Sequence, residues 1–283
     1  MAESLVVSEL ESVIAHEPVD EVLVVLPMDK YGHLVETIVH LCEEQGIIVR
    51  VQTEMFNLRV ARSHVDELDG VPVLTIRSGP QDSWQLVAKR LIDILGSAAL
   101  LLALAPLFAA VALVIKFGSP GPVFFGQKRA GFSKRRFRLI KFRTMLDGAD
   151  KQQQILEHLN EADGPVFKIK NDPRITPIGK FLRRFSIDEL PQLFNVLKGD
   201  MSLVGPRPLP VRDADRIDVI SHKRRFSIKP GITCLWQVNG RSNISFDDWV
   251  RMDLEYIDKW SLGLDMKILI KTIPVVLRGS GAY

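Results

Sequence analysis

The sequence of 283 residues lacks several features that define common classes of protein. Its two cysteines, Cys42 and Cys234, are far apart and have no C-x-x-C partner, which excludes a disulfide mini-protein and favours a reducing, cytosol-facing environment. No Gly-x-Gly-x-x-Gly motif follows a strand, so dinucleotide binding has no support. With 46% hydrophobic residues, the chain is neither disordered nor collagen-like and can bury a sizeable core.

The net charge of only +3 conceals an uneven distribution of charge along the chain. Residues 1–80 carry 14 acidic and 5 basic residues, a net charge of −9. Residues 81–283 carry 32 basic and 20 acidic residues, a net charge of +12. This asymmetry indicates an anionic partner for the second segment, and nucleic acid, a phosphorylated ligand and an acidic lipid all meet that description.

Residues 1–80 are expected to form part of an α/β domain. Short apolar runs at 21–27, 47–51 and 71–76 predict three strands, and apolar residues at helical spacing from 34 to 42 predict a helix between the first two. This βαβ order is typical of a doubly wound sheet. With only three strands, we interpret the segment as an incomplete regulatory or assembly module.

A stretch of 22 residues from 94 to 115 contains no charged residue and is long enough to cross the hydrocarbon core of a membrane. Pro106 near its middle predicts a helix break at Ala105-Pro106. Basic residues flank both ends, so both ends prefer the cytoplasmic side. We therefore predict a re-entrant helix-hairpin over 81–118; a buried core helix of a soluble protein is the alternative.

A dense basic block follows from Lys128 to Arg143, with eight Lys or Arg, no acidic residue and interleaved phenylalanines. It is compatible with a solvated basic face, with attraction to an anionic leaflet, or with nucleic-acid binding through stacked aromatics. Because the uncharged stretch is adjacent, we assign the block mainly to the membrane surface.

The stretch Ser-Ile-Asp-Glu-Leu-Pro-Gln from Ser186 is the strongest candidate for chemistry. Ser186 and Glu189 have the spacing of a capping box, which predicts the start of a helix and, beside Arg183, a place for phosphate. The adjacent Asp188 and Glu189 offer a carboxylate nucleophile or Mg²⁺ ligand and a neighbour that tunes it. The alternative is a helix start with no catalytic part.

Three rigid loops present basic residues in the same region of the sequence. Arg207 lies between Pro206 and Pro208, which fix the backbone and suit the guanidinium to a phosphate or a planar base. Lys229 begins a Lys-Pro-Gly turn, and Arg241 ends a Trp-Gln-Val-Asn-Gly loop. With the acidic pair, these loops indicate a phosphorylated substrate. A membrane-bound assembly module without activity and a soluble nucleic-acid binder are the other functions considered.

Several short motifs follow one another along the second part of the chain: Ser119–Phe125, Gln127–Arg129, Lys141–Met145, Asp188–Gln192 with Asn195, Gly199–Ser202, Gly205–Pro208, Lys229–Thr233, Trp236–Arg241 and Leu264–Lys267. In these motifs residues 84–283 resemble the bacterial sugar transferase family of monotopic polyprenyl-phosphate phosphoglycosyl transferases, of the undecaprenyl-phosphate hexose-1-phosphate transferase type. Residues 1–80 resemble the tail of the Rossmann-like domain of larger members. The sequence departs from the family's frequent Ser-Pro helix break, where it has Ala105-Pro106.

The resemblance implies a two-step transfer of phosphosugar. Asp188 would attack the phosphate next to the sugar of a UDP-sugar, with UDP-glucose and UDP-galactose the commonest in the family, and UMP would leave. Undecaprenyl phosphate would then take the phosphosugar from Asp188. Glu189 would activate this acceptor or help Asp188 hold Mg²⁺, and Asp265 matches a further acid of the metal site.

The resemblance also implies the fold class and the setting. The fold would be α+β: a mainly helical, membrane-associated catalytic domain over 119–283, preceded by the re-entrant helix and a partial Rossmann-like fragment. Arg183 and Arg241 match phosphate-contacting arginines, and Arg207 lies in a loop near the nucleotide. The enzyme would act at the cytoplasmic face of the bacterial inner membrane, among anionic lipids and without nucleic acid, in exopolysaccharide, capsule or O-antigen lipopolysaccharide synthesis. A homodimer formed through the two ends of the chain is compatible with this resemblance.

Overall fold

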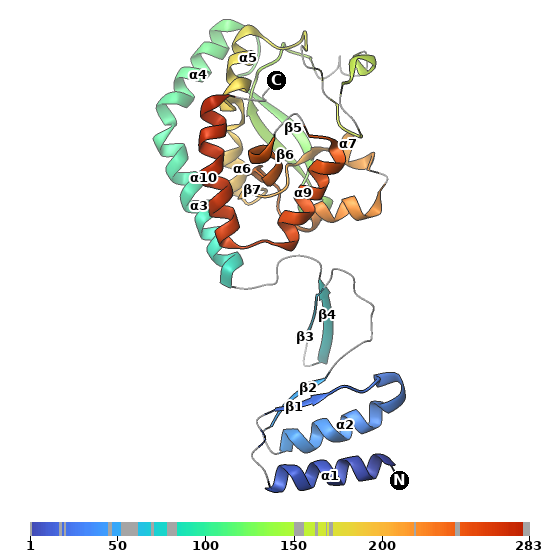
Figure 1. Cartoon of the computed structure of the whole chain (residues 1–283). Helices are drawn as coiled ribbons and strands as arrows, with labels where there is room; N and C mark the ends of the chain where they lie inside the picture. Colours follow the sequence, from blue (N-terminus) through green and yellow to red (C-terminus); the bar gives the residue numbers. More distant parts are fainter. Residues whose placement is uncertain are drawn as a thin grey trace. The chain divides into compact units, whose positions relative to one another are not determined.

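The computed structural model describes residues 2–16, 19, 21–44, 47–51, 62–68, 71–77, 84–149, 156–161, 164–167, 169, 172–217, 219–240 and 244–279. The chain divides into two compact units, Met1–Arg62 and Ser63–Tyr283, and each is described by itself (Figure 1).

The first unit contains the predicted βαβ arrangement. Its elements are α1 (Ala2–His16), β1 (Glu21–Val24), α2 (Met28–Glu44) and β2 (Ile48–Val51). β1 and β2 pair in parallel, with Glu21 opposite Ile48 and Val24 opposite Val51. The buried residues Leu34, Ile38 and Cys42 of α2 pack in one cluster with Val24 of β1, which confirms the helical spacing of the sequence. α1, which no motif predicted, packs on the same cluster.

The third predicted strand does not join this sheet. β3 (Arg62–Leu68) and β4 (Val71–Arg77) form a separate two-stranded sheet. Only two residues separate them, so local pairing costs less loop-closure entropy than a crossover back to the first sheet. The prediction that 71–76 extends the βαβ sheet is therefore wrong, and within the described residues the Rossmann-like likeness is limited to one βαβ pair.

The uncharged stretch forms two helices, α3 (Trp84–Ala103) and α4 (Ala105–Gly118), bent by 61° at Leu104. Pro106 lies in the first turn of α4, where its missing N–H costs no helical hydrogen bond. The predicted break at Ala105-Pro106 is thus confirmed to within a residue. Among the described residues no single helix is long and apolar enough to span a membrane, but this bent pair satisfies the length and composition criteria together.

Polar contacts attach the N-terminal half of α3 to the rest of the larger unit. The buried Asp93 carboxylate accepts hydrogen bonds from Leu203 N at 2.9 Å and Ser202 Oγ at 3.1 Å. Arg90 donates to Val196 O at 2.7 Å, at the C-terminal end of α6 (Gln192–Lys198). In contrast, Leu102 of α3 is 79% exposed and Phe117 of α4 is 86% exposed, so the bent pair has an uncovered apolar side.

Short strands form the centre of the larger unit. β5 (Phe124–Ala130) and β6 (Arg136–Phe142) pair antiparallel, and β8 (Leu209–Pro210) adds to β5. β7 (Ser202–Val204) pairs in parallel with β9 (Gly231–Thr233). The helical elements around them are η1 (Phe132–Lys134), η2 (Glu157–Leu159), α5 (Pro177–Arg184), η3 (Ile187–Glu189), α6, α7 (Val211–Asp215), η4 (Ile220–Ser227), α8 (Leu235–Asn239), α9 (Phe246–Asp258) and α10 (Leu262–Arg278).

Local sequence sets the starts of three of these helices. Thr176, Ser245 and Ser261 each accept a hydrogen bond on the side chain from a backbone N–H three residues later, which stabilises α5, α9 and α10 at their first turns. α9 and α10 then bury Tyr256 and Ile268 in the main apolar cluster, against Leu139 of β6. This cluster supports β6, whereas Ile187 of η3 packs against a second cluster that contains Phe142 and Leu182.

Candidate functional site

The acidic pair lies on η3, a single turn between α5 and α6. Ser186, which precedes it, has φ 55° and ψ 21°, in the left-handed region, and its side chain does not cap the turn. The predicted capping box is therefore wrong, whereas a phosphate at this turn beside Arg183 stays a prediction. The Glu189 side chain is bound instead by two cations, and these charge-assisted hydrogen bonds outweigh a bond back to the backbone.

Glu189 is bound by cationic side chains from two other parts of the chain. Lys141 Nζ, on β6, lies 2.9 Å from Glu189 Oε1. Arg207 Nη1 donates to Glu189 Oε2 at 3.0 Å, and Arg207 Nη2 donates to Oε1, which makes the pair bidentate. Burial alone would raise the pKa of Glu189, but Arg207 and Lys141 outweigh it and hold the pKa well below its ordinary value. Glu189 is therefore ionised at neutral pH.

Asp188 differs from its neighbour in its environment. It is only 6% exposed, and among the described residues its carboxylate has no hydrogen-bond or ion-pair partner. Burial raises the pKa of Asp188; Lys141 opposes this shift, Glu189 adds to it, and Arg183 and Arg207 oppose it. The carboxylate is thus more basic than an ordinary aspartate and has its oxygens unengaged, which suits a nucleophile or a ligand for a cation.

Arg183 reaches this place from the last turn of α5. Its Nε donates to Thr144 Oγ1 at 3.0 Å, which orients the guanidinium. Burial lowers the pKa of Arg183, while Asp188 opposes that shift. The structure thus brings together Asp188, Glu189, Arg183 and Arg207, as predicted.

The Pro206–Pro208 loop is held at each of its three carbonyl groups. Gly231 N donates to Pro206 O at 3.0 Å, Arg225 Nη2 to Arg207 O at 2.9 Å, and Arg129 Nη1 to Pro208 O at 2.9 Å. Gly231 has to be glycine because a Cβ there would collide with the backbone of Gly205. Two motifs that lie apart in the sequence therefore meet at this loop and fix the Arg207 backbone.

Three members of the basic block do not face a membrane surface. Lys141 binds Glu189, and Arg129 binds the Pro208 carbonyl. Arg143 is 6% exposed and donates to Ser119 O at 2.8 Å. The assignment of the whole block to the membrane is therefore wrong for these residues, whereas its other members are exposed: Lys128, Lys134, Arg135, Arg136 and Arg138.

Asp265 lies in a different polar cluster. Lys89 Nζ lies 2.6 Å from its Oδ2, Tyr256 OH donates to Oδ1 at 2.6 Å, and Trp260 Nε1 lies 3.3 Å from Oδ2. These bonds join α3, α9 and α10. In the described part of the chain, no three His, Cys, Asp or Glu side chains are grouped so as to hold a metal ion. The structure therefore does not place Asp265 with Asp188 and Glu189.

Of the two adjacent acids, Asp188 is compatible with a part in holding Mg²⁺. This ion usually keeps several waters and binds one or two carboxylates together with substrate phosphate, so it does not require a cage of three side chains. Asp188 offers carboxylate oxygens that have no partner among the described residues. Both oxygens of Glu189, in contrast, already accept hydrogen bonds from Lys141 or Arg207.

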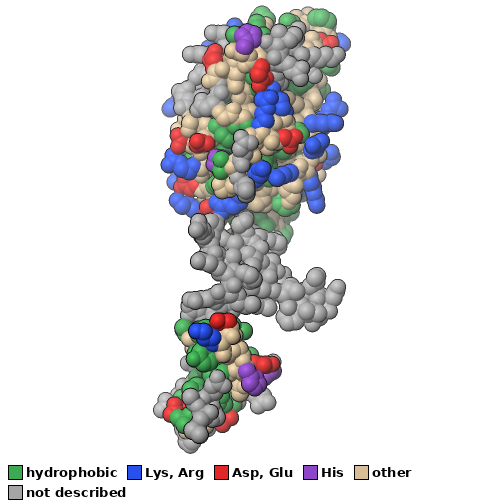
Figure 2. Space-filling model, turned by 90° about the vertical axis from the view of Figure 1, so that its right-hand side faces the viewer, with side chains coloured by type: hydrophobic (Ala, Val, Ile, Leu, Met, Phe, Trp, Pro, Cys, Tyr) green, Lys and Arg blue, Asp and Glu red, His purple; other side chains and the backbone are tan. Residues whose placement is uncertain are grey.

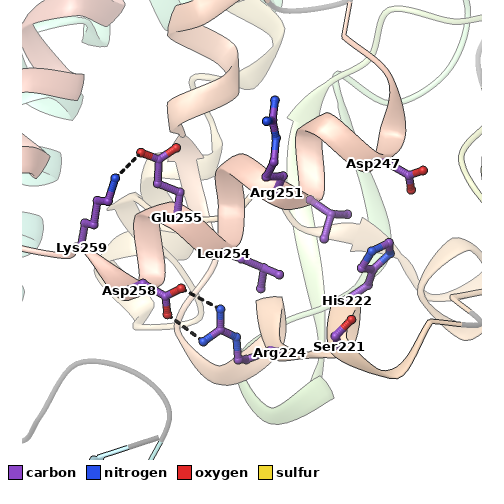
Figure 3. Close-up of a pocket in the computed structure, with 10 residues that line it drawn as sticks. Ser221, His222, Arg224, Asp247, Arg251, Leu254, Glu255, Asp258 and Lys259 are labelled. Carbon is purple, nitrogen blue, oxygen red and sulfur yellow. Dashed lines mark hydrogen bonds and ion pairs between the residues drawn. The ribbon is translucent and has the colours of Figure 1, made fainter. Parts of the chain in front are cut away.

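Some predicted or prominent features lie outside this site. Arg241 falls outside the described residues. A surface hollow of about 440 Å³ lies between η4 and α9, and its cations are paired with carboxylates: Arg224 with Asp258, and Lys259 with Glu255 (Figure 3). None of the predicted site residues lines it. On the face of the larger unit in Figure 2, Lys and Arg side chains likewise lie among Asp and Glu.

Lys141 and Arg225 belong to the site although no motif of the sequence predicts them there. Lys141 shares the parity of Phe137 and Leu139 on β6, so the strand period of two would have placed it on the packed face. Arg225 had no such signal, since it lies on an irregular 3₁₀ segment.

Comparisons with known proteins agree with the arrangement of motifs. The bacterial sugar transferase family profile matches residues 84–279. The galactosyl transferase CpsE of Streptococcus agalactiae is 41% identical over 269 residues, which cover 93% of this chain and 59% of that protein. The exopolysaccharide production protein ExoY of Rhizobium meliloti is 38% identical, covering 70% of this chain and 88% of that protein. A UDP-glucose:undecaprenyl-phosphate glucose-1-phosphate transferase of Xanthomonas campestris is 36% identical, covering 97% and 56%.

Proposed function

Because the chain belongs to the bacterial sugar transferase family, we propose that it is an enzyme that transfers a sugar-1-phosphate from a UDP-sugar to undecaprenyl phosphate. The chain spans 59% and 56% of the length of two of the relatives that it matches, so their whole activity is carried over here as a proposal. The names of these relatives support galactose or glucose as the sugar and exopolysaccharide synthesis as the pathway.

The observation that carries the proposal is the unequal environment of two adjacent carboxylates. Glu189 is ionised and saturated by Lys141 and Arg207, whereas the buried Asp188 has no partner among the described residues and a raised pKa. Pairs of acids with separated pKa values are typical of catalytic sites. The surrounding cations match the charge of a diphosphate, and phosphoryl transfer depends mainly on positioning and charge neutralisation.

In the first step, a carboxylate oxygen of Asp188 attacks the phosphorus that carries the sugar. A bond forms between that oxygen and phosphorus, and the bond from this phosphorus to the oxygen bridging to the uridine side breaks. UMP leaves with the bridging oxygen and its electron pair, and Arg207, Arg183 and Lys141 stabilise the charge on the leaving and transferred phosphates. A phosphosugar remains on Asp188 as an acyl phosphate.

In the second step, a phosphate oxygen of undecaprenyl phosphate attacks the same phosphorus. The bond between phosphorus and the Asp188 oxygen breaks, the carboxylate is restored, and the product is an undecaprenyl diphosphosugar. Glu189 orients the acceptor phosphate through the two cations that it holds, because its lowered pKa makes it too weak a base to take a proton from the phosphate. Asp188 is the nucleophile of the first step and the leaving group of the second, and both steps use the same cations, so Glu189 has to keep Lys141 and Arg207 in place throughout.

Mg²⁺ would be held by Asp188 together with the substrate phosphates, since Lys141 and Arg207 occupy the oxygens of Glu189, and when bound it would supply additional neutralisation of phosphate charge. The residues of the chain retain their own tasks: Arg207 and Lys141 bind and orient the phosphates, and Arg183, oriented by Thr144, lies beside Asp188.

We further propose that α3 and α4 form the re-entrant hairpin at the cytoplasmic face of the inner membrane. The 61° bend at Leu104 and the exposed apolar side chains support it. The exposed basic residues of the block next to α4 suit anionic head groups.

The decisive experiment compares wild type with Asp188→Asn in lipid nanodiscs with Mg²⁺, undecaprenyl phosphate and a panel of UDP-sugars. Wild type should release UMP with UDP-galactose or UDP-glucose, and the variant should not. Asp247→Asn, an exposed aspartate of α9, is the matched control and should match wild type. Without acceptor, intact mass should show a phosphosugar on wild type and on Asp247→Asn but not on Asp188→Asn. UMP release by Asp188→Asn at the wild-type rate would overturn the assignment.

A further inference from the structure

Arg225 and Asp253 form an ion pair inside the larger unit. Arg225 belongs to η4 and Asp253 to α9, and Arg225 Nη2 lies 2.7 Å from Asp253 Oδ2. Both side chains are only 1% exposed. The same Nη2 donates to the main-chain carbonyl oxygen of Arg207 at 2.9 Å. The pair thus connects α9, through η4, to the residue whose side chain binds Glu189.

Stability alone does not account for this pair. Removing two charges from water is costly, and well-packed apolar residues often replace a buried ion pair without loss of stability. Burial raises the pKa of Asp253 to about 7, although Arg225 opposes the shift. In the described part of the chain, Arg225 Nη1 has no hydrogen-bond partner, which adds to the cost. The hydrogen bond from Arg225 to the Arg207 carbonyl, in contrast, connects the ion pair to the backbone of a site residue.

We propose that Arg225, held by Asp253, is a positioning residue for Arg207: by fixing the Arg207 backbone it keeps the Arg207 guanidinium on Glu189 and beside Asp188. The effect on turnover rests on the proposed function, whereas the effect on Glu189 does not. Because Arg207 hydrogen-bonds Glu189 through both Nη atoms, a small displacement of its backbone weakens two bonds together.

Arg225→Lys tests the proposal and Arg224→Lys is its matched control. Lysine keeps the positive charge but lacks the planar fork that reaches the two acceptors at fixed angles. Arg224 is the next residue in the chain and also joins η4 to α9, through Asp258 at 2.7 and 2.9 Å, but it binds no part of the Arg207 loop (Figure 3). Both variants therefore loosen the same two elements, and only one loosens Arg207.

If wild type releases UMP from a UDP-sugar, the rate of UMP release should be about tenfold to about a hundredfold lower in Arg225→Lys. A loss of this size is typical when a catalytic group is slightly misplaced. The acidic limb of its kcat against pH should move to higher pH, because Arg207 helps to keep Asp188 ionised. In an Arg207→Lys background, Arg225→Lys should add no further loss, since it acts through Arg207. Arg224→Lys should match wild type throughout.

A second measurement does not depend on activity. Carbodiimide labels protonated carboxyl groups, and Arg207 protects Glu189 by keeping it ionised. Labelling of Glu189, measured by peptide mass spectrometry on the full chain in nanodiscs, should rise at least about threefold in Arg225→Lys, the result of a half-unit rise in pKa. It should stay at the wild-type level in Arg224→Lys.

If Arg225→Lys does not fold, as judged from its Tm, Asp253→Asn replaces it and Asp258→Asn becomes the control. Unchanged Glu189 labelling in a folded Arg225→Lys or Asp253→Asn overturns the positioning role, whatever the activity. If wild type releases no UMP from any UDP-sugar, the proposed function fails, and the labelling still decides the positioning role.

Discussion

Replacing Lys141 by Met separates the site described here from the membrane role that its sequence position indicates. Lys141 and Lys128 belong to the same basic block, but Lys141 lies 2.9 Å from Glu189 and its side chain is 18% exposed, whereas Lys128 is exposed on the paired strand β5. If the block served only the membrane, both substitutions would weaken binding to anionic vesicles and leave chemistry intact. The structure predicts a different result for each.

The size of the effect follows from the contacts of Glu189. Lys141→Met removes one charge-assisted hydrogen bond but leaves Arg207 on the carboxylate, so the free energy of unfolding should fall by about 1–3 kcal/mol and the fold should survive. Loss of one preorganised cation beside the reacting phosphate should lower kcat by about 10²–10³-fold. Lys128→Met, at the surface, should change the free energy of unfolding by no more than about 0.5 kcal/mol.

Three assays on the same preparations decide the matter: urea unfolding, UMP release, and co-sedimentation with vesicles that contain anionic phospholipid. Lys141→Met should lose turnover and keep its vesicle binding. Equal turnover in Lys141→Met and Lys128→Met would refute the placement of Lys141 at the site. Loss of vesicle binding in Lys141→Met alone would show that Lys141 binds the membrane surface.

Other predictions concern charge and topology. Wild type should have a larger free energy of unfolding than Glu189→Gln, and this difference should be greatest above the ordinary Glu pKa of 4.5. It should shrink as the pH falls, because the pKa of Glu189 is lowered in the folded protein; a difference that stays constant with pH in urea unfolding would contradict this. Turnover should fall at low pH with a midpoint above the ordinary Asp value of 3.8, since the pKa of Asp188 is raised, and a midpoint below it would contradict the burial argument. EDTA should abolish UMP release and added Mg²⁺ should restore it; full activity in EDTA would exclude the metal. Cysteines at Trp84 and Phe117, both exposed, should be labelled from the same side of a vesicle, and labelling from opposite sides would exclude the hairpin.

The features that the sequence predicted correctly are those set by local chemistry. The helix break near Pro106 follows from the missing N–H of proline, and the βαβ pair in the first unit follows from apolar periodicity. The grouping of Asp188, Glu189, Arg183 and Arg207 was predicted through the resemblance to a family, which carries the long-range information that spacing lacks.

The errors arose where distant residues compete for the same group. Ser186 and Glu189 have the spacing of a cap, but Lys141 and Arg207 bind the Glu189 carboxylate more strongly than a backbone N–H would. The composition of the basic block suggested one role, at the membrane surface, for all eight of its basic residues. The alternation of side chains along β6 instead places Lys141 on the packed face of the strand. The third strand is a different case: the apolar run at 71–76 predicts a strand of the first sheet, but the neighbouring strand β3 pairs with it locally.

The contacts of α3 have a practical consequence for anyone who wishes to prepare a soluble form. Deleting the chain before residue 119 would remove Lys89 from the buried Asp265 and would also remove the Asp93 carboxylate that accepts from the Leu203 amide of β7. Asp265 would then carry a buried charge without its cation, and β7, which leads directly into the Arg207 loop, would lose an anchor. The apolar helix is therefore part of the scaffold of the catalytic unit. Solubility is better sought by replacing the exposed Leu102 and Phe117 with polar residues while α3 itself is kept.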